Sequence, residues 1–326
     1  MEKGVAEILE EGGVKPKDIK SIIWRFVGLA IKLMIQSAEF RGSHSHFDHT
    51  GDPSTFPSST ELVVGPGFKE SIMPGYPAKE DSAIRESDYK GREVREIEFH
   101  NAGLCLGHFR AMDYFGDGSF YLLDSPGVCK PRISSPPPFF GYMSVEILIL
   151  WQHAIGHMCG LCRTTTAPDT FVFLGGDCAH NAGEWRPTNY LSLPDEITPS
   201  PLPAIRSNAC PGALLIPLHR FYHKDATSPD CDADAMRHPF FTVRDEASHD
   251  GAEARESVEH MCEFDAHDNI FTMIAHDNTM LDAIDFFPKA PANEWKQKGW
   301  REKVMWQFLR DFHEAVADHV DNEARR

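Results

Sequence analysis

The chain has 326 residues, of which 41% are hydrophobic, so it can bury one large core or two smaller ones. Its formal net charge of −17 argues against nucleic acid and anionic membranes as partners, because nothing would balance their phosphates. Two apolar runs, 22–35 and 142–151, contain charged residues and are shorter than the ~20 residues that span a bilayer. We therefore expect no transmembrane segment.

The eight cysteines are scattered and follow no compact disulfide framework. Cys159 and Cys162 form a single CxxC pair, which without a second pair is more typical of buried thiols than of a zinc site. The N-terminal residues lead into a polar helix and not into a secretory signal. Together these features predict a reducing, cytoplasmic location.

The first part of the chain predicts short elements around one polar loop. Residues 5–10 have helical apolar spacing and are followed by two glycines, and Pro16 begins a second short helix. That helix runs toward an apolar strand at 22–24. Residues 43–57 are rich in His, Gly and Pro, which predicts a loop.

Strands dominate the middle of the chain, and helices alternate with strands after it. The predicted strands are 61–65, 95–99, 104–114, 119–123, 171–174 and 270–275, with a hairpin turn at 116–118. The predicted helices are 252–264 and 295–317. This order predicts α/β layers and not an all-β barrel. The sequence contains no internal repeat.

The loop His44-Ser45-His46-Phe47-Asp48-His49 is the strongest chemical signal in the chain. Three histidines and one aspartate within six positions, on a Gly/Pro-rich loop, favour a metal site. Imidazoles and carboxylates together suit Zn²⁺.

Three further residues are candidate ligands, because side chains at the ends of strands can converge on that loop. Asp177 follows the strand 171–174, and His276 follows the strand 270–275. His157 comes after Pro126-Gly127, though at a distance. A lone histidine is more often a filler than a ligand, and His276-Asp277 could instead cap a helix.

The segment His44–Asp52, HSHFDHTGD, resembles the signature of the metallo-β-lactamase superfamily. Gly175-Gly176-Asp177 and Ile274-Ala275-His276-Asp277 resemble its later ligand motifs, and residues 176–187 resemble a fungal, lactonase-like branch. The resemblance covers nearly the whole chain, 1–326, as a single domain. It implies an αββα four-layer sandwich with the site at the shared edge of two sheets.

The resemblance also implies a role for each ligand. His44, His46 and His157 would hold one zinc ion, Asp48, His49 and His276 would hold a second, and Asp177 would bridge the two. Such a pair activates a hydroxide that opens a small lactone, lactam or ester. Asp48 could orient this nucleophile or pass a proton to the leaving group. His180 stands near the place of a tyrosine that assists the substrate carbonyl in the lactonase branch.

The sequence departs from the family pattern at two insertions. Removing 128–152 gives Asp-Ser-Pro-Gly-His-Ala-Ile-Gly-His, and removing 25–42 joins the strand 22–24 directly to Ser43-His44. We hypothesise that both segments are translated introns; the alternative is genuine surface insertions. Only about 40 residues precede the metal loop, so we also expect the fold to lack its N-terminal strands.

The sequence leaves two other functions open. The same scaffold can hold iron and act as an oxidoreductase, or the chain could be the inactive product of a faulty gene model. Trp185, Tyr222, Phe240 and Phe241 could line an apolar substrate pocket, although aromatic residues are more often core residues. The substrate within the lactone, lactam and ester classes and the oligomeric state do not follow from the sequence.

Overall fold

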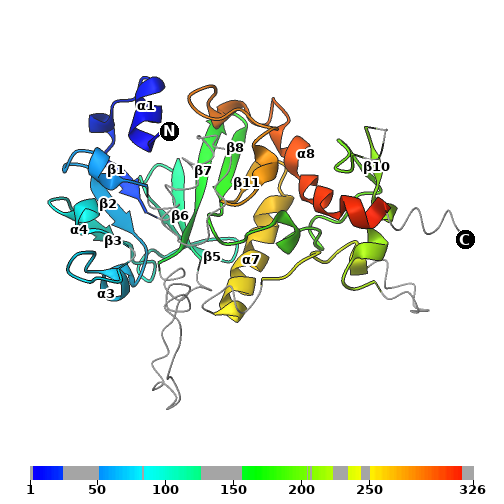
Figure 1. Ribbon diagram of the computed structural model, residues 1–326, viewed down its shortest axis with the longest axis horizontal. Coiled ribbons are helices and arrows are strands. Elements are labelled where there is room, and N and C mark those ends of the chain that lie inside the picture. The colour runs from blue at the N-terminus through cyan, green and yellow to red at the C-terminus, as the bar shows by residue number, and fades with distance from the viewer. Residues whose placement is uncertain are drawn as a thin grey trace, which may run out of the picture.

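The computed structural model describes residues 3–24, 51–82, 84–125, 156–203, 205, 208–222, 234–243 and 250–317. These residues form a mixed α/β fold with three sheets, as the sequence predicts at the level of fold class (Figure 1). The loop residues His44, His46, Asp48 and His49 lie outside the described residues, as do the segments 25–42 and 128–152.

A three-stranded parallel sheet is formed by β1 (Ser21–Ile23), β2 (Glu61–Val64) and β3 (Val94–Glu96), with β2 in the centre. One face packs against α1 (Val5–Glu11) and α3 (Phe68–Ile72) through an apolar cluster that includes Trp24. A short helix, α4 (Glu86–Tyr89), precedes β3. The strand expected at 22–24 is confirmed at 21–23, and the one expected at 95–99 lies at 94–96.

The largest sheet has six strands in the order β11-β8-β7-β6-β5-β4. Its members are β4 (Leu104–Leu106), β5 (Phe109–Asp113), β6 (Phe120–Asp124), β7 (Met158–Thr166), β8 (Asp169–Leu174) and β11 (Ile270–Met273). Neighbours from β4 to β8 are antiparallel, whereas β11 runs parallel to β8. The carboxyl ends of β8 and β11 therefore meet at one edge of the sheet.

The strand predicted over 104–114 is wrong as a single element, because the chain turns back on itself within it. Leu106 pairs with Phe109, which leaves Gly107 and His108 as a two-residue turn between β4 and β5. Gly107 has a φ of +52°, a conformation that glycine adopts without steric cost.

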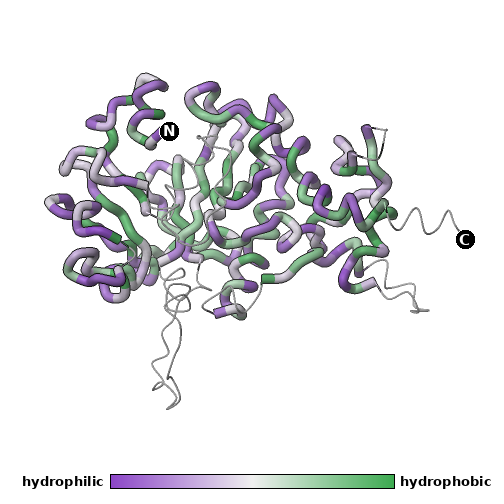
Figure 2. Tube along the Cα trace, viewed as in Figure 1, coloured by the Kyte–Doolittle hydropathy of each residue, from purple (hydrophilic) through white to green (hydrophobic). Residues whose placement is uncertain are grey.

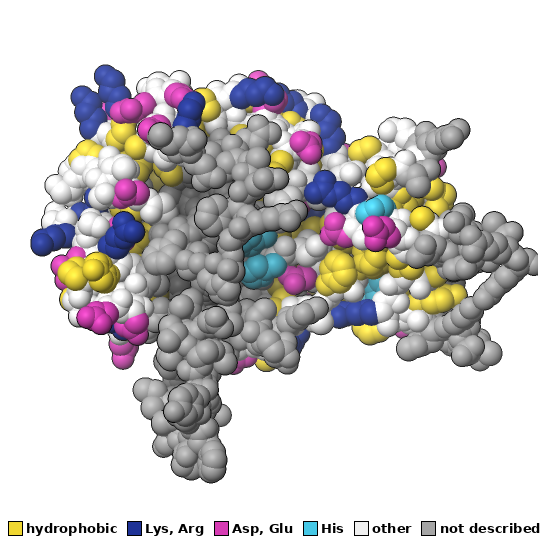
Figure 3. Space-filling view, viewed as in Figure 1, with side chains coloured by type: hydrophobic (Ala, Val, Ile, Leu, Met, Phe, Trp, Pro, Cys, Tyr) yellow, Lys and Arg dark blue, Asp and Glu magenta, His cyan; other side chains and the backbone are white. Residues whose placement is uncertain are grey.

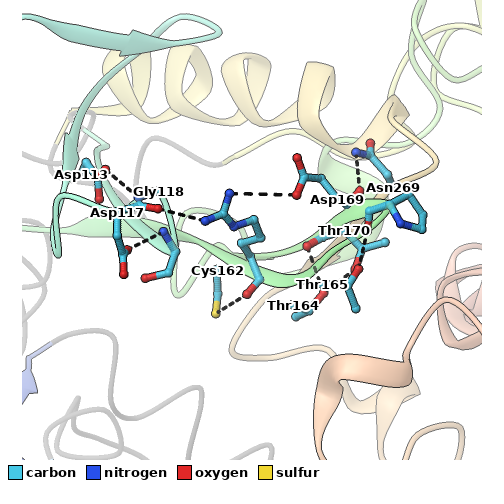
Figure 4. Close-up of polar contacts among 12 residues, drawn as sticks. Asp113, Asp117, Gly118, Cys162, Thr164, Thr165, Asp169, Thr170 and Asn269 are labelled. Atoms are coloured by element: carbon cyan, nitrogen blue, oxygen red, sulfur yellow. Dashed lines mark hydrogen bonds and ion pairs between the residues drawn. The ribbon is translucent and has the colours of Figure 1, made fainter.

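The hairpin of β7 and β8 is held at its turn by polar side chains (Figure 4). Thr164 Oγ1 lies 2.7 Å from Thr170 Oγ1, and Asn269 Nδ2 donates to the Asp169 carbonyl at 3.1 Å. Arg163 Nη2 donates to the Asp117 carbonyl at 2.9 Å, which ties β7 to the turn before β6. These contacts fix the end of the hairpin opposite to the one that carries Asp177.

The helix α7 (Gly251–Ala266) begins at Asp250, whose side chain accepts the N–H groups of Ala252 and Glu253. This confirms the helix predicted over 252–264. The helix predicted over 295–317 is only partly right: the structure has α8 (Trp300–Val304), a 3₁₀ segment at Gln307–Phe312 and a further helical turn after it.

Short elements complete the described structure. A two-stranded sheet pairs β9 (Glu196–Ile197) with β10 (Cys210–Pro211). Further 3₁₀ segments lie at Pro16–Asp18, Pro53–Thr55, Ala182–Glu184, Gly212–Leu214, Ile216–Leu218, Asn278–Met280 and Ala292–Glu294.

The core lies on both faces of the six-stranded sheet, where the hydrophobic stretches of the chain run together (Figure 2). On one face, Leu123 and Phe173 belong to the same buried cluster as Met261 of α7. On the other face, Leu122 and Met158 join Val63 of β2. This second cluster packs the two large sheets against each other.

The charged side chains and the cysteines are arranged as expected for an ordinary globular protein with free thiols. Lys, Arg, Asp and Glu side chains are interspersed on the face shown in Figure 3. The six cysteines in the described residues are free thiols, and Cys159 of the CxxC pair is fully buried, as predicted for ordinary core thiols. In the part of the chain that the structure describes, no helix has the length and apolar character that crossing a membrane requires.

Candidate metal site

Asp177 and His276 are brought together by the parallel pairing of β8 with β11. Leu174 pairs with Met273 at the carboxyl end of both strands. Beyond it, the Gly175 N–H donates to the Met273 carbonyl at 2.8 Å and the Ala275 N–H donates to the Gly176 carbonyl at 2.9 Å. The two following loops are thereby held in register, and His276 Nε2 lies 3.2 Å from Asp177 Oδ1.

His157 enters the site from the neighbouring strand, immediately before β7. Its side chain is buried, and its Nε2 accepts a hydrogen bond of 3.1 Å from the Asp177 backbone N–H. The sequence places His157 among the metal ligands, and the structure brings it to the loop that carries Asp177.

The position of His157 depends on a close backbone approach between two glycines. A Cβ atom on Gly65, which follows β2, would lie 2.1 Å from the Gly156 carbonyl oxygen. Gly156 itself has a φ of +75°, which disfavours any other residue. The first sheet and the strand that follows His157 are thus joined at a point where only glycine fits.

His180 lies beside the same pair of residues. Its ring stacks on the ring of His276, with centroids 5.1 Å apart and planes inclined by 11°. One potential ligand atom from each of Asp177, His180 and His276 lies within 4.8 Å of the other two. His180 is exposed, whereas Asp177 and His276 are partly buried.

This donor set fits a divalent transition metal. Two imidazoles and one carboxylate are the ligand types that Zn²⁺ takes in proteins. The three side chains start from two adjacent loops whose backbones are hydrogen-bonded to each other, so their spacing is set by the sheet. The other four predicted ligands, His44, His46, Asp48 and His49, fall outside the described residues.

A buried ion pair, which the sequence does not predict, anchors the chain shortly after His180. Arg186 donates two hydrogen bonds to Asp265 of α7 and a third to the Met305 carbonyl. Its charge also lies 5.0 Å from the centre of the Trp185 ring. The sequence gives only a weak signal for this pair, because Arg186 and Asp265 are far apart in the chain.

Three of the aromatic residues considered for a substrate pocket are core residues. Trp185 and Phe240 are almost completely buried, and both belong to the cluster that covers α7. Phe241 is partly buried and packs against this cluster, where its ring stacks on Phe312. These three side chains therefore serve packing.

Comparison with curated proteins gives close relatives. The chain is 41% identical over 312 residues to "Gamma-lactamase FDB1" of Fusarium pseudograminearum, covering 94% of this chain and 62% of that protein. It is 39% identical over 313 residues to "Metallo-hydrolase mfmC" of Annulohypoxylon moriforme, covering 95% and 66%. It is 42% identical over 229 residues to "Gamma-lactamase MBL2" of Gibberella moniliformis, covering 70% and 77%.

The chain belongs to the metallo-β-lactamase-like family. This confirms the family that the sequence resembles. The chain spans about two thirds of the length of the Fusarium and Annulohypoxylon members of the family. No family model matches the chain. No solved structure matches it either.

Proposed function

We propose that this chain is a metal-dependent hydrolase that opens a small lactam, or a related lactone or ester. The observation that carries the proposal is the convergence of Asp177, His180 and His276 at the carboxyl ends of β8 and β11. Two relatives named gamma-lactamase and one named metallo-hydrolase support the reaction class and put a lactam first among the substrates.

The proposed site holds two zinc ions. His44, His46 and His157 are assigned to one ion, Asp48, His49 and His276 to the other, and Asp177 to both. When bound, the metal ions would polarise the scissile carbonyl and activate water. The contact of 3.2 Å between Asp177 and His276 supports their assignment to one centre.

Groups of the protein itself are expected to hold the ligands in position and to transfer protons at this centre. The hydrogen bond from the Asp177 N–H to His157 fixes the two residues relative to each other. Asp48 is assigned the role of orienting the nucleophile or passing a proton to the leaving nitrogen or oxygen. The partial exposure of Asp177 and His276 leaves the centre open to a small molecule.

We further infer that the fold is the αββα four-layer sandwich of the family. The packing supports this arrangement: α1 and α3 cover the three-stranded sheet, whose β2 packs on β6 and β7 of the six-stranded sheet. The far face of the six-stranded sheet packs on α7. In such an arrangement the proposed metal centre would lie at an edge that the two sheets share.

The experiment compares zinc-loaded wild-type protein with Asp177→Asn and His276→Gln on a panel of γ-lactams, lactones and esters. His313→Gln, at an exposed position, serves as a control for the loss of an imidazole outside the proposed ligand set. We expect kcat/KM to fall by at least ~100-fold in both site variants, because even residues that only orient metal ligands cost roughly 10–100-fold. A folded wild-type protein that binds zinc and hydrolyses no member of the panel would refute the proposal.

A further inference from the structure

We propose that His180 is itself a metal ligand, beside Asp177 and His276. This inference rests on the proposed function, because it concerns the same centre. It replaces the role in assisting the substrate carbonyl that the family resemblance implies for this position. The loop after β8 places the imidazole beside the other two donors, and three features support coordination: the distances, the freedom of the side chain and the donor chemistry.

The distances are close to those of a coordination shell. In a tetrahedral zinc site with bonds of ~2.0–2.1 Å, ligand atoms lie roughly 3.4 Å apart. The contact between His276 Nε2 and Asp177 Oδ1, at 3.2 Å, already has this separation. The ligand atom of His180 lies within 4.8 Å of both, so a side-chain shift of roughly 1–1.5 Å would bring it to that distance.

The backbone of His180 is fixed, whereas its side chain has room to make this shift. The His180 N–H donates to Glu184 Oε2 at 2.8 Å, and the Asn181 side chain accepts the Gly183 N–H at 2.8 Å. The preceding residues Cys178 and Ala179 are buried in the core. The imidazole is exposed, so rotation about its side-chain torsions meets little packing.

The chemistry of the three side chains also suits one shared cation. The rings of His180 and His276 are inclined by only 11° with centroids 5.1 Å apart, so the shift that brings His180 to the ion must also rotate its ring out of this stack. A bound dication would attract both imidazole nitrogens and the carboxylate at once. An additional nitrogen donor makes the centre prefer Zn²⁺ or Co²⁺ over Mg²⁺ and Mn²⁺, which favour oxygen ligands.

The test titrates metal-free full-length protein with Co²⁺ and Zn²⁺ against a competing chelator and records the visible spectrum of the cobalt form. The variants are His180→Ala and His180→Cys, with His313→Ala as the control for the loss of an exposed histidine outside the proposed ligand set. Circular dichroism confirms that each variant keeps the wild-type fold. Metal affinity and the cobalt spectrum do not depend on activity.

We expect His180→Ala to weaken one of the bound ions by at least ~10-fold and to change the cobalt d–d bands, because a lost direct ligand costs no less than an outer-shell partner. His180→Cys should restore affinity and add a thiolate-to-cobalt absorption band, since thiolates are strong ligands for these metals. His313→Ala should match the wild type.

Two results would overturn the inference in different ways. If the wild type binds Co²⁺ and His180→Ala has the same affinity and spectrum, then His180 is not a ligand while the proposed hydrolase site stands. If the wild type binds neither metal, then both the site and the role of His180 are rejected.

Discussion

Arg186 and Asp265 form an ion pair in which both side chains are 2% exposed. Arg186 Nε donates to Asp265 Oδ2 at 2.7 Å, and Nη2 donates to Oδ1 at 2.6 Å. Burial raises the pKa of Asp265, but the charge and hydrogen bonds of Arg186, with the charge of Arg301, outweigh burial and hold this pKa below its ordinary value. The pair connects the loop after His180 to α7.

Removing one charge of this pair should destabilise the fold strongly. Asp265→Asn leaves the buried Arg186 without its counter-charge, so we expect the free energy of unfolding to fall by about 3–5 kcal/mol. Urea denaturation at pH 7 measures it. Lys289→Ala, which removes a solvent-exposed pair with Asp285, is the control and should cost far less, because water and salt screen an exposed pair. Equal losses in the two variants would contradict the role of burial.

His219 is held as a neutral imidazole in one tautomer. Its Nδ1 accepts the Phe221 N–H at 3.2 Å, and its Nε2 donates to the His238 carbonyl at 2.8 Å. Burial lowers the pKa of His219, and the nearby charge of Arg220 acts in the same direction, although the hydrogen bond to the His238 carbonyl opposes them. Protonation would also remove the acceptor that Phe221 uses.

This lowered pKa predicts a stability that decreases on acidification. The unfolded chain binds a proton at His219 near the ordinary pKa of ~6.5, but the folded chain binds it only at lower pH. The stabilising contribution is therefore present above ~6.5 and is lost as the pH falls toward the folded pKa. We expect His219→Gln to flatten the dependence of urea stability on pH between about 7.5 and 5. An unchanged slope would contradict this prediction.

Gly65 is predicted to tolerate no side chain. In Gly65→Ala, the new Cβ would lie 2.1 Å from the Gly156 carbonyl, so the two loops must separate. We expect a loss of about 1–3 kcal/mol in the free energy of unfolding, typical of overpacking, and weaker zinc binding because His157 follows Gly156. Gly4→Ala is the control, since its Cβ would meet only the Glu7 carboxylate at 4.0 Å. Wild-type stability and zinc affinity in Gly65→Ala would refute the prediction.

The two segments 25–42 and 128–152 are predicted to be absent from the mature transcript. Sequencing cDNA from the native host tests this directly, and a transcript that keeps both segments would reject the intron hypothesis. If the intron hypothesis is right, a protein lacking both segments should unfold at a higher temperature and bind more zinc than the chain of 326 residues. Variants lacking only one segment are the controls.

The sequence predicts the elements on which the described site is built. The strands before Asp177 and His276 are short apolar runs followed by glycine or polar residues, which is a strong local signal. Their parallel pairing, and so the contact between the two side chains, comes from the whole sheet. The sequence also indicates the α/β class, which the structure confirms.

Other features have weak local signals. The strand β7 is apolar only at its start and ends in Arg163 and three threonines, so it does not stand out as a strand. The turn at Gly107-His108 interrupts a run that reads as one continuous strand. The helical C-terminal region is broken because Gly299 adopts a φ of +62° before α8. Arg186 and Asp265 meet only because tertiary packing brings their elements together.

The pairing of β8 with β11, which lies far along the chain, has a consequence for synthesis of the protein. A ribosome that has passed His180 has already made the proposed ligands Asp177 and His180, but the strand that delivers His276 is translated much later. Asp177, His180 and His276 therefore cannot come together before β11 is made, so under the proposed assignment they cannot jointly capture a metal ion early in translation. Products that end before Ile270 would keep the recognisable motif but lose the partner strand of β8.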